Sequence, residues 1–207
     1  MGKIVKDREI RRQEIIAAAQ RRFEKQGYTK TAVESIIQDV GIAKGTFYYY
    51  FRSKQDILRA IVENIILELE AYFSSIVKSE ELTVMQKLYE MFAGCKKQEL
   101  IQLSIMETVH LPENRELQEQ LNVESIKLIA PLITDVLRQG YSEGLFKKKV
   151  SLESVQIFLA GIQFILDSGL FDWTNKQRTV FLREVQNLFE SMVDVKAGTL
   201  SFIVSKC

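Results

Sequence analysis

This sequence has few of the residues that mark secreted, zinc-binding or membrane proteins. Its 207 residues include two cysteines, Cys95 and Cys207, which lie far apart and form no CxxC or Cys/His spacing. That spacing argues against a disulfide framework and a structural zinc site. No uncharged apolar run reaches the roughly 18 residues of a membrane-spanning helix, and the N-terminal region is rich in Lys, Arg and Glu, unlike a signal peptide. We therefore expect a cytoplasmic protein without a membrane segment.

Proline and strand-like patterns are equally scarce. The two prolines are Pro112 and Pro131, and there are no sustained alternating Val/Ile/Thr runs. With 46% hydrophobic and 27% charged residues, the composition is that of a globular protein. We expect an all-α protein of about nine helices, in which the short apolar tail "TLSFIVSKC" has no assigned state.

Catalytic and cofactor motifs are also missing. His110 is the single histidine, and the sequence contains no recognisable Ser/His/Asp or Cys/His set, no glycine-rich phosphate loop and no metal-ligand spacing. We predict that the chain is not an enzyme and binds no cofactor or metal. A catalytic site assembled from carboxylates distant in the sequence stays open, although nothing indicates one.

Charge is distributed unevenly, although it sums to +1. Residues 1–60 contain 13 Lys and Arg against 7 Asp and Glu, whereas the remainder contains 15 against 20. Such an asymmetry suggests that the N-terminal segment interacts with a polyanion. A solvated basic surface without a partner would give the same count, so charge alone leaves both interpretations open.

The basic segment divides into short helices. The first is expected over residues 8–26, where apolar residues follow one face up to a glycine. The motif "TAVE" predicts a capping box for the second helix, with the Thr31 hydroxyl bonded to the Glu34 amide. A third helix is expected over residues 44–50 after a glycine turn, and Ser53 is expected to cap a long fourth helix.

The third helix lies in "GIAKGTFYYYF" and has an unusual run of aromatic residues. At about 100° per residue, Phe51 lies about 40° from Phe47, while Tyr49 points nearly opposite and Tyr48 lies on the flank. We therefore expect Phe47 and Phe51 in the core and Tyr48 and Tyr49 outside it. Tyr50 lies nearer the core.

Two helices joined by a tight glycine turn on a basic segment form a helix-turn-helix arrangement. The second helix fits the major groove of double-stranded DNA, Gly45 permits close approach, and tyrosine hydroxyls reach phosphates. The alternative is that the tyrosines are partly buried packing residues of a helical bundle.

The stretch from Ile10 to Ile61, and above all "FEKQGYTKTAVESIIQDVGIAKGTFYYYFRSKQDIL", resembles the DNA-binding head of the tetracycline-repressor (TetR) family of bacterial transcription regulators. We divide the chain accordingly into a helix-turn-helix domain, residues 1–52, and a helical ligand-binding and dimerisation domain, residues 53–207. The resemblance implies that Tyr48 and Lys54 contact phosphates. The full set of residues that it implies for operator DNA is Thr31, Lys44, Gly45, Thr46, Tyr48, Tyr49 and Lys54.

Longer amphipathic helices are predicted beyond the head. Their expected ranges are residues 83–95, 98–110, 113–140 with a kink or break at the internal proline, 152–171 and 175–195. The last two are apolar on broad faces and must be buried on more than one side. The resemblance implies that they form a four-helix bundle in a homodimer, and the alternative is the centre of a monomeric body. The candidate dimer residues are Leu159, Gly161, Phe181, Val185, Leu188, Phe189 and Met192.

The middle helices concentrate aromatic and methionine residues with a few polar groups. This composition is typical of a cavity for a small apolar ligand, although each residue taken singly also fits a core. The candidates are Tyr72, Phe73, Tyr89, Phe92, Met106, Glu107, His110, Phe158, Ile162 and Gln163.

These features together predict a ligand-responsive transcription regulator. We expect a repressor that a small, largely apolar molecule releases from a palindromic operator. One alternative is a TetR-like DNA-binding protein that acts without a small-molecule ligand, as a chromosome-organising or protein-partnered factor. Activation in place of repression is a further alternative, and an enclosed cavity in the body would favour the ligand-responsive form.

Overall fold

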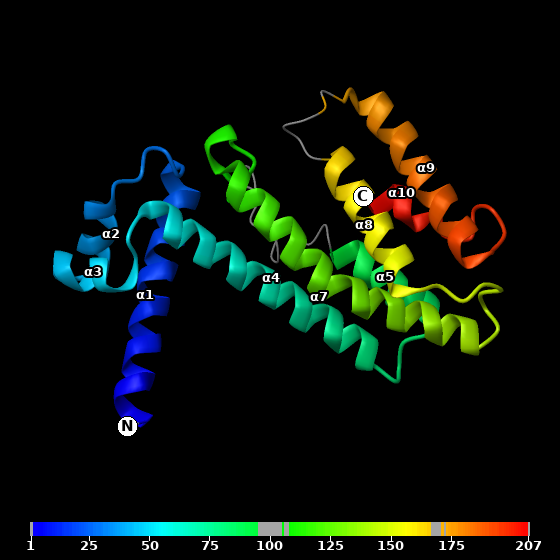
Figure 1. Cartoon of the computed structure of the whole chain (residues 1–207), viewed down its shortest axis with the longest axis horizontal. Helices are drawn as coiled ribbons and strands as arrows, with labels where there is room; N and C mark the ends of the chain where they lie inside the picture. The colour runs from blue at the N-terminus through cyan, green and yellow to red at the C-terminus, as the bar shows by residue number, and fades with distance from the viewer. Residues whose placement is uncertain (1, 95–104, 106–107, 167–170, 172, 207) are drawn as a thin grey trace. The chain divides into compact units, whose positions relative to one another are not determined.

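Helices make up the regular secondary structure of the part of the chain that the structure describes (Figure 1). The structure is a computed structural model, and it describes all residues except 1, 95–104, 106–107, 167–170, 172 and 207. The chain forms two compact units: a head unit, Met1–Ile66 with Gln102–Leu117, and a body unit, Leu67–Ile101 with Gln118–Cys207. The all-α prediction is confirmed, whereas the domain boundary after residue 52 stays a prediction.

The head unit contains three complete helices and the first turns of a fourth. Their bounds are α1 (Gly2–Gln26), α2 (Val33–Val40), α3 (Lys44–Tyr50) and α4 (Lys54–Lys78). The single-turn 3-10 helix η1 (Pro112–Asn114) belongs to the same unit. A helix as short as α3 is not stable alone, so packing on a shared apolar core holds it in place. That core includes Ile15, Ala19, Phe23, Ile36, Phe47, Phe51, Ile57 and Ile61.

The start of α2 differs from the predicted capping box. Its N-cap residue is Ala32, and no side-chain hydrogen bond caps the helix there. Thr31 is buried; its hydroxyl donates to the Gly27 carbonyl at 2.8 Å and accepts from Gln26 Nε2 at 3.2 Å. The capping-box prediction is wrong because this hydroxyl closes the end of α1 and does not bond to the first amides of α2.

The turns on either side of α3 follow the prediction. Gly41 ends α2 with a φ of 70°, a left-handed conformation that favours glycine. The Ser53 hydroxyl accepts from the Asp56 amide at 3.1 Å, and the Asp56 carboxylate accepts from the Arg52 amide at 3.0 Å. These two hydrogen bonds cap the first turn of α4 and favour its start shortly after α3.

The body unit contains the rest of α4, most of a long helix α7 (Arg115–Ser142), and four further helices: α5 (Val84–Gly94), α8 (Leu152–Leu166), α9 (Asn175–Val193) and α10 (Phe202–Lys206). α7 continues through Pro131, so the predicted break does not occur. The predicted helix over residues 98–110 falls mostly on residues outside those described. The buried core of this unit includes Phe73, Leu88, Met91, Ile133, Leu137, Val155, Phe189, Leu200 and Ile203.

The C-terminal tail, which the sequence leaves unassigned, is part of this core. The buried Glu190 carboxylate of α9 accepts from the amides of Gly198 at 3.0 Å and Leu200 at 2.7 Å, and from Gln186 Nε2 at 3.0 Å. Three donors compensate for the burial of the carboxylate. They fix the turn before α10, which packs against α9 and α5.

Candidate nucleic-acid interface and body cavity

α3 separates its aromatic side chains by face. Phe47 and Phe51 are 0% and 3% exposed, whereas Tyr48 and Tyr49 are 45% and 63% exposed. Tyr50 is half-buried, and its ring centroid lies 5.0 Å from that of Tyr49. The division predicted from the helical angles is confirmed, and it leaves two tyrosines on the outer face.

The first turn of α3 is open to a large partner. Lys44 is exposed, and its Nζ lies 3.6 Å from the exposed Glu34 carboxylate, a weak surface pair that a stronger anion can replace. A Cβ built on Gly45 would have no neighbouring atom within 4 Å. Thr46, the next residue, is half-buried. A partner can therefore approach the backbone of this turn closely.

Lys54 begins α4, but its ammonium group bonds within the head unit. Its Nζ donates to the carbonyls of Tyr28 at 2.7 Å, Thr31 at 3.0 Å and Thr29 at 3.4 Å. It also lies 4.2 Å from the centroid of the Tyr28 ring, within the range of a cation–π interaction. Burial lowers the pKa of Lys54. An ammonium has three donors, and all three are directed at the turn between α1 and α2.

The structure therefore separates the residues predicted to contact DNA into two groups. Five of them lie together on α3: Lys44, Gly45, Thr46, Tyr48 and Tyr49. The other two, Thr31 and Lys54, direct their polar groups to backbone carbonyls inside the head unit. Sequence reasoning missed this arrangement because the carbonyls that Lys54 contacts lie 23 to 26 residues earlier in the chain.

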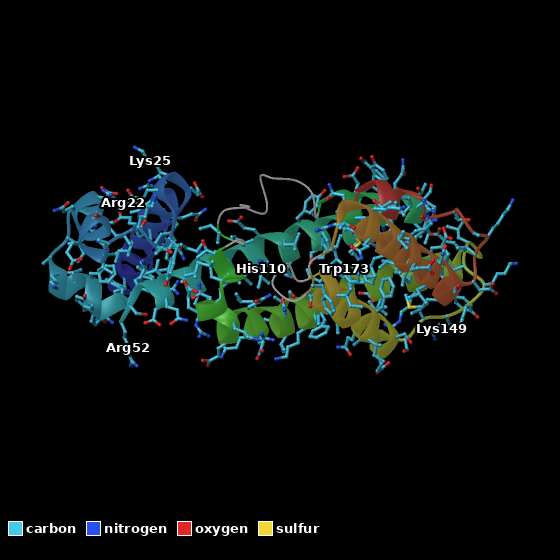
Figure 2. All side chains as sticks on the ribbon, turned by 90° about the horizontal axis from the view of Figure 1, so that it is seen from above. Arg22, Lys25, Arg52, His110, Lys149 and Trp173 are labelled. Atoms are coloured by element: carbon cyan, nitrogen blue, oxygen red, sulfur yellow. The ribbon has the colours of Figure 1, made fainter. Side chains whose placement is uncertain are left out.

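An ion pair joins α1 to α2. Arg22 Nε and Nη2 donate to Asp39 Oδ2 and Oδ1 at 2.5 and 2.7 Å, which is the bidentate geometry of a strong pair. The hydrogen bond from Arg22 holds the pKa of Asp39 below its ordinary value, and the same bond raises the pKa of Arg22. Other cations of the head unit, such as Lys25 and Arg52, extend away from the ribbon (Figure 2).

Two arginines of α1 lie against aromatic rings at α3. The guanidinium carbon of Arg8 is 5.6 Å from the Tyr49 ring centroid, and that of Arg12 is 5.5 Å from the Phe51 ring centroid. These contacts place positive charge beside the exposed tyrosine. The basic excess in the sequence indicated such charge, but its position depends on how α1 packs.

The body unit contains a cavity of about 220 Å³. Its described wall is formed by side chains from α4, α5, α7, α8 and α9. Among these described side chains, Ser125 and Gln163 are the polar ones. A mostly apolar wall with a few polar groups is typical of small-molecule sites. The apolar lining residues are Leu69, Phe73, Met91, Phe92, Ile129, Ile133, Val155, Phe158, Leu159 and Phe189.

Four residues predicted for ligand binding line this cavity: Phe73, Phe92, Phe158 and Gln163. Four others do not: Tyr72, Tyr89, His110 and Ile162. The Tyr72 hydroxyl bonds to Glu90 at 3.3 Å, Tyr89 packs edge-on against Phe202, and His110 belongs to the head unit. Met106 and Glu107 lie outside the described residues. The aliphatic wall residues were missed because cavity and core positions share the same helical periodicity.

α8 and α9 form a second, more open hollow of about 450 Å³. Ile157 and Leu188, which line it, are 74% and 62% exposed. Five predicted dimer residues line this groove: Gly161, Phe181, Val185, Leu188 and Met192. Leu159 and Phe189 line the inner cavity instead. Ile157 was missed because a helix that is apolar on several sides does not indicate which side faces outward.

Two negative findings apply to the described part of the chain. Among those residues, no three His, Cys, Asp or Glu side chains are grouped so that they could hold a metal ion. None of the helices described combines the length and the apolar composition that crossing a membrane requires.

Family models match both parts of the sequence. The model for bacterial regulatory proteins of the tetR family matches residues 15–61, and the model for a tetracyclin repressor-like C-terminal domain matches residues 99–186. The first match includes the second half of α1, the helix-turn-helix of α2 and α3, and the start of α4. The second includes α7, α8 and part of α9.

Individual relatives agree with these models. The fatty acid metabolism regulator protein of Bacillus subtilis strain 168 is 24% identical over 181 residues, which cover 84% of this chain and 89% of that protein. A regulator of the HTH type from the lacX 3′ region of Lactococcus lactis subsp. lactis is 29% identical over 80 residues, or 39% of this chain and 41% of that protein.

A solved structure shares the fold. The transcriptional regulator FadR from Bacillus subtilis, in complex with stearoyl-CoA, superposes with a TM-score of 0.58 at 22% identity and covers 94% of this chain and 98% of that one. At this identity the likeness shows the fold alone. The two family models, the relatives and the helix-turn-helix geometry lead to one conclusion: the chain belongs to the TetR family of DNA-binding transcriptional regulators and is not an enzyme.

Proposed function

We propose that this protein is a homodimeric cytoplasmic repressor that a small, largely apolar effector releases from a palindromic operator. The observation on which the proposal rests is the outer face of α3. It exposes Lys44, Tyr48 and Tyr49 while Phe47 and Phe51 anchor the helix from behind. A short helix that is held rigidly and exposes a cation and two tyrosines suits insertion into the major groove.

The residues on α3 have distinct proposed roles. Lys44 and Thr46, in the first turn, reach base edges and determine sequence preference. Tyr48 donates to a phosphate, Tyr49 contacts sugar or thymine methyl groups, and Gly45 lets the backbone approach. Thr31 and Lys54 act indirectly, because their polar groups hold the turn between α1 and α2.

We expect a dimer because a single recognition helix contacts only a short stretch of DNA. One short recognition helix contacts too few base pairs for useful specificity, so two copies bind half-sites about 34–36 Å apart, or a multiple of that spacing. The apolar groove of α8 and α9 is the surface proposed for the second copy. Its exposed Ile157 and Leu188 would be covered there.

The cavity of the body unit is the proposed effector site. Its wall favours an apolar molecule. The relative named as a fatty acid metabolism regulator, and the structural neighbour that holds stearoyl-CoA, support an effector with a large apolar part. A purely chromosome-organising protein has no need of such a cavity.

Release from DNA requires two states of the dimer. An effector that binds better in a state whose recognition helices no longer match successive grooves lowers operator affinity. α4 begins at Lys54 and supplies Leu69 and Phe73 to the cavity wall, so one helix contains residues of both sites. A coupling free energy of about 1–3 kcal/mol, or about 5- to 150-fold in affinity, is sufficient for regulation.

The test begins with selection of genomic fragments that the protein binds at physiological salt. The expected result is a palindrome with half-sites spaced by whole helical turns, and genes beside it that suggest effectors. Operator affinity is then measured with those molecules present. Absence of sequence-specific binding would contradict the DNA-binding part. A palindrome whose affinity no small molecule changes would favour the alternative of a regulator without an effector.

A further inference from the structure

The wall of the body cavity is polar at a single place. Among its described lining residues, only Ser125 of α7 and Gln163 of α8 have polar side chains, and the two are bonded to each other. No Lys, Arg, Asp or Glu lies in the described wall. A charged group inside this space would find no counter-charge among these described residues, which makes its burial beside them unfavourable.

The hydrogen bonds at this place have a definite direction. The Ser125 hydroxyl donates to the Asn122 carbonyl at 2.9 Å. Its one hydrogen is then committed, so Ser125 Oγ acts as acceptor toward the Gln163 amide, and Gln163 Nε2 donates to it at 2.8 Å. The amide is therefore oriented, with Nε2 toward Ser125 and Oε1 away from it.

Gln163 Oε1 is buried and has no hydrogen-bond partner, the single such side-chain atom found among the described residues. A buried acceptor without a donor costs as much as a lost hydrogen bond, and native structures contain few of them. Gln163 lines the cavity, so a small movement of its side chain would expose Oε1 to a ligand that brings the missing donor.

We infer that the effector bound in this cavity is neutral and mostly apolar, and that it has a hydroxyl or N–H group that donates to Gln163 Oε1. This inference rests on the proposed function and names the chemical class of its effector. A carboxylate at this place would set its oxygens against the lone pairs of Oε1, so the anionic end of a fatty acid does not bind to Gln163.

The volume limits the size of the part that is enclosed. An apolar protein cavity of about 150 Å³ holds one benzene molecule, and the cavity here measures about 220 Å³. A single ring with a short alkyl group, or an aliphatic chain of similar volume, fits this space. Phenols, alkanols and neutral primary or secondary amides of that size belong to the inferred class.

Two isosteric probes test the inference by calorimetric titration of the full-length protein. 4-Ethylphenol and 4-ethyltoluene have nearly the same shape, but only the phenol can donate to Oε1. We expect the wild-type protein to bind the phenol roughly tenfold or more tightly, because only the phenol gives the buried Oε1 a hydrogen-bond donor. Equal affinity for the two probes, or no binding of the phenol, overturns the inference.

Two variants test whether the preference for the phenol comes from the Gln163 amide. Gln163→Leu should bind the two probes with similar affinity. Gln156→Leu is the matched control, since Gln156 is half-buried on the same helix but does not line the cavity, and it should keep the preference. A preference that persists in Gln163→Leu, with thermal denaturation showing a folded protein, also overturns the inference.

A second variant keeps the amide but removes its orientation. Ser125→Ala deletes the acceptor for Nε2, so the amide can turn and offer a donor. In the wild-type protein the phenol should bind more tightly than 4-ethylanisole, whose oxygen only accepts. In Ser125→Ala the phenol should lose most of this advantage. An unchanged advantage would contradict the orienting role of Ser125 and, with it, the assignment of Oε1 as the acceptor.

These outcomes separate the inference from the proposed function. Probe affinities report on the cavity alone, whereas operator titrations report on regulation. If the phenol binds through Gln163 but no member of its class changes operator affinity, the ligand-responsive function fails and the chemistry of the cavity stands. If operator affinity responds only to ligands without a donor, the function stands and the inference fails.

Discussion

At the scale of single residues, a substitution at Lys54 tests whether this residue contacts DNA or acts through the protein. Its three bonds to the turn of residues 28–31 are internal. We predict that Lys54→Met lowers operator affinity and destabilises the head by about 1 kcal/mol, because two part-buried carbonyls and one exposed carbonyl lose their donor. The salt dependence of binding should stay unchanged, since no phosphate contact is lost.

Lys44→Met provides the contrast. If Lys44 contacts a phosphate, removal of its charge should reduce the slope of log affinity against log salt by about one for each head. If it contacts a base edge, the variant should relax sequence preference at that position. A reduced salt slope in Lys54→Met would contradict the indirect role that we assign to it.

A substitution at Gly45 should change stability and DNA binding in opposite directions. Because a Cβ at this position meets no atom of the head, Gly45→Ala should keep the fold and add about 0.5–1 kcal/mol of helix stability. The added methyl group should keep α3 away from the groove. Operator affinity should fall by roughly tenfold, in line with the roughly 1–3 kcal/mol that one lost base contact costs. Thermal denaturation and binding titration check both parts, and unimpaired binding would refute the close approach.

Periodicity explains which of these residues the sequence could predict. The angles of α3 assigned Phe47 and Phe51 to the core and Tyr48 and Tyr49 to the surface, because a helix determines the relative directions of its own side chains. Thr31 and Lys54 were assigned to DNA because their sequence positions match the family motif. In the structure their polar groups bond to carbonyls of a turn whose position depends on tertiary packing.

At the scale of elements, the Arg22–Asp39 pair between α1 and α2 predicts a pH dependence. The bond from Arg22 lowers the pKa of Asp39 below its usual 3.8. Stabilisation by this pair is therefore present above pH 3.8 and is lost as the pH falls through the lower, folded-state pKa. Asp39→Asn should unfold at a lower temperature than wild type near neutral pH. The two thermal midpoints should converge in strong acid, and a difference that does not shrink would contradict this linkage.

The hydrogen bonds of Glu190 predict a second effect, on the connection between α9 and α10. Its carboxylate bonds to two amides of the segment that leads into α10. Glu190→Ala should lower the free energy of unfolding by about 2–3 kcal/mol, and the Leu200 amide should exchange its hydrogen faster. Urea denaturation and hydrogen exchange measure the two effects. Asn187→Ala, an exposed change on the same helix, is the control and should alter neither.

The helices themselves were largely predictable, with instructive exceptions. Glycine turns and the Ser53 cap are local signals, so α3 and α4 begin where the sequence indicated. The state of the tail was not predictable, because α10 depends on a carboxylate of α9. Pro131 did not break α7, since a proline costs one helical hydrogen bond and the surrounding core compensates.

At the scale of the whole molecule, the groove of α8 and α9 predicts the oligomeric state. Leu188→Glu places a charge on an apolar groove that we propose is covered by a second copy. We expect a monomer in sedimentation and a large loss of operator affinity, because two half-sites are no longer bound together. Leu67→Glu is the matched control: Leu67 is exposed on α4 outside the groove. A dimeric Leu188→Glu variant would exclude this interface.

The sequence by itself determined the all-α class, the basic N-terminal segment, the helix-turn-helix and its two aromatic faces. These depend on composition and on the period of single helices, which are local properties of the chain. Tertiary structure decided which apolar residues surround a cavity and which fill a core, where Lys54 and Thr31 direct their polar groups, and that Gln163 keeps an acceptor without a donor. Each of these depends on partners far apart in the sequence, and helical periodicity indicates an apolar face without indicating what lies opposite it.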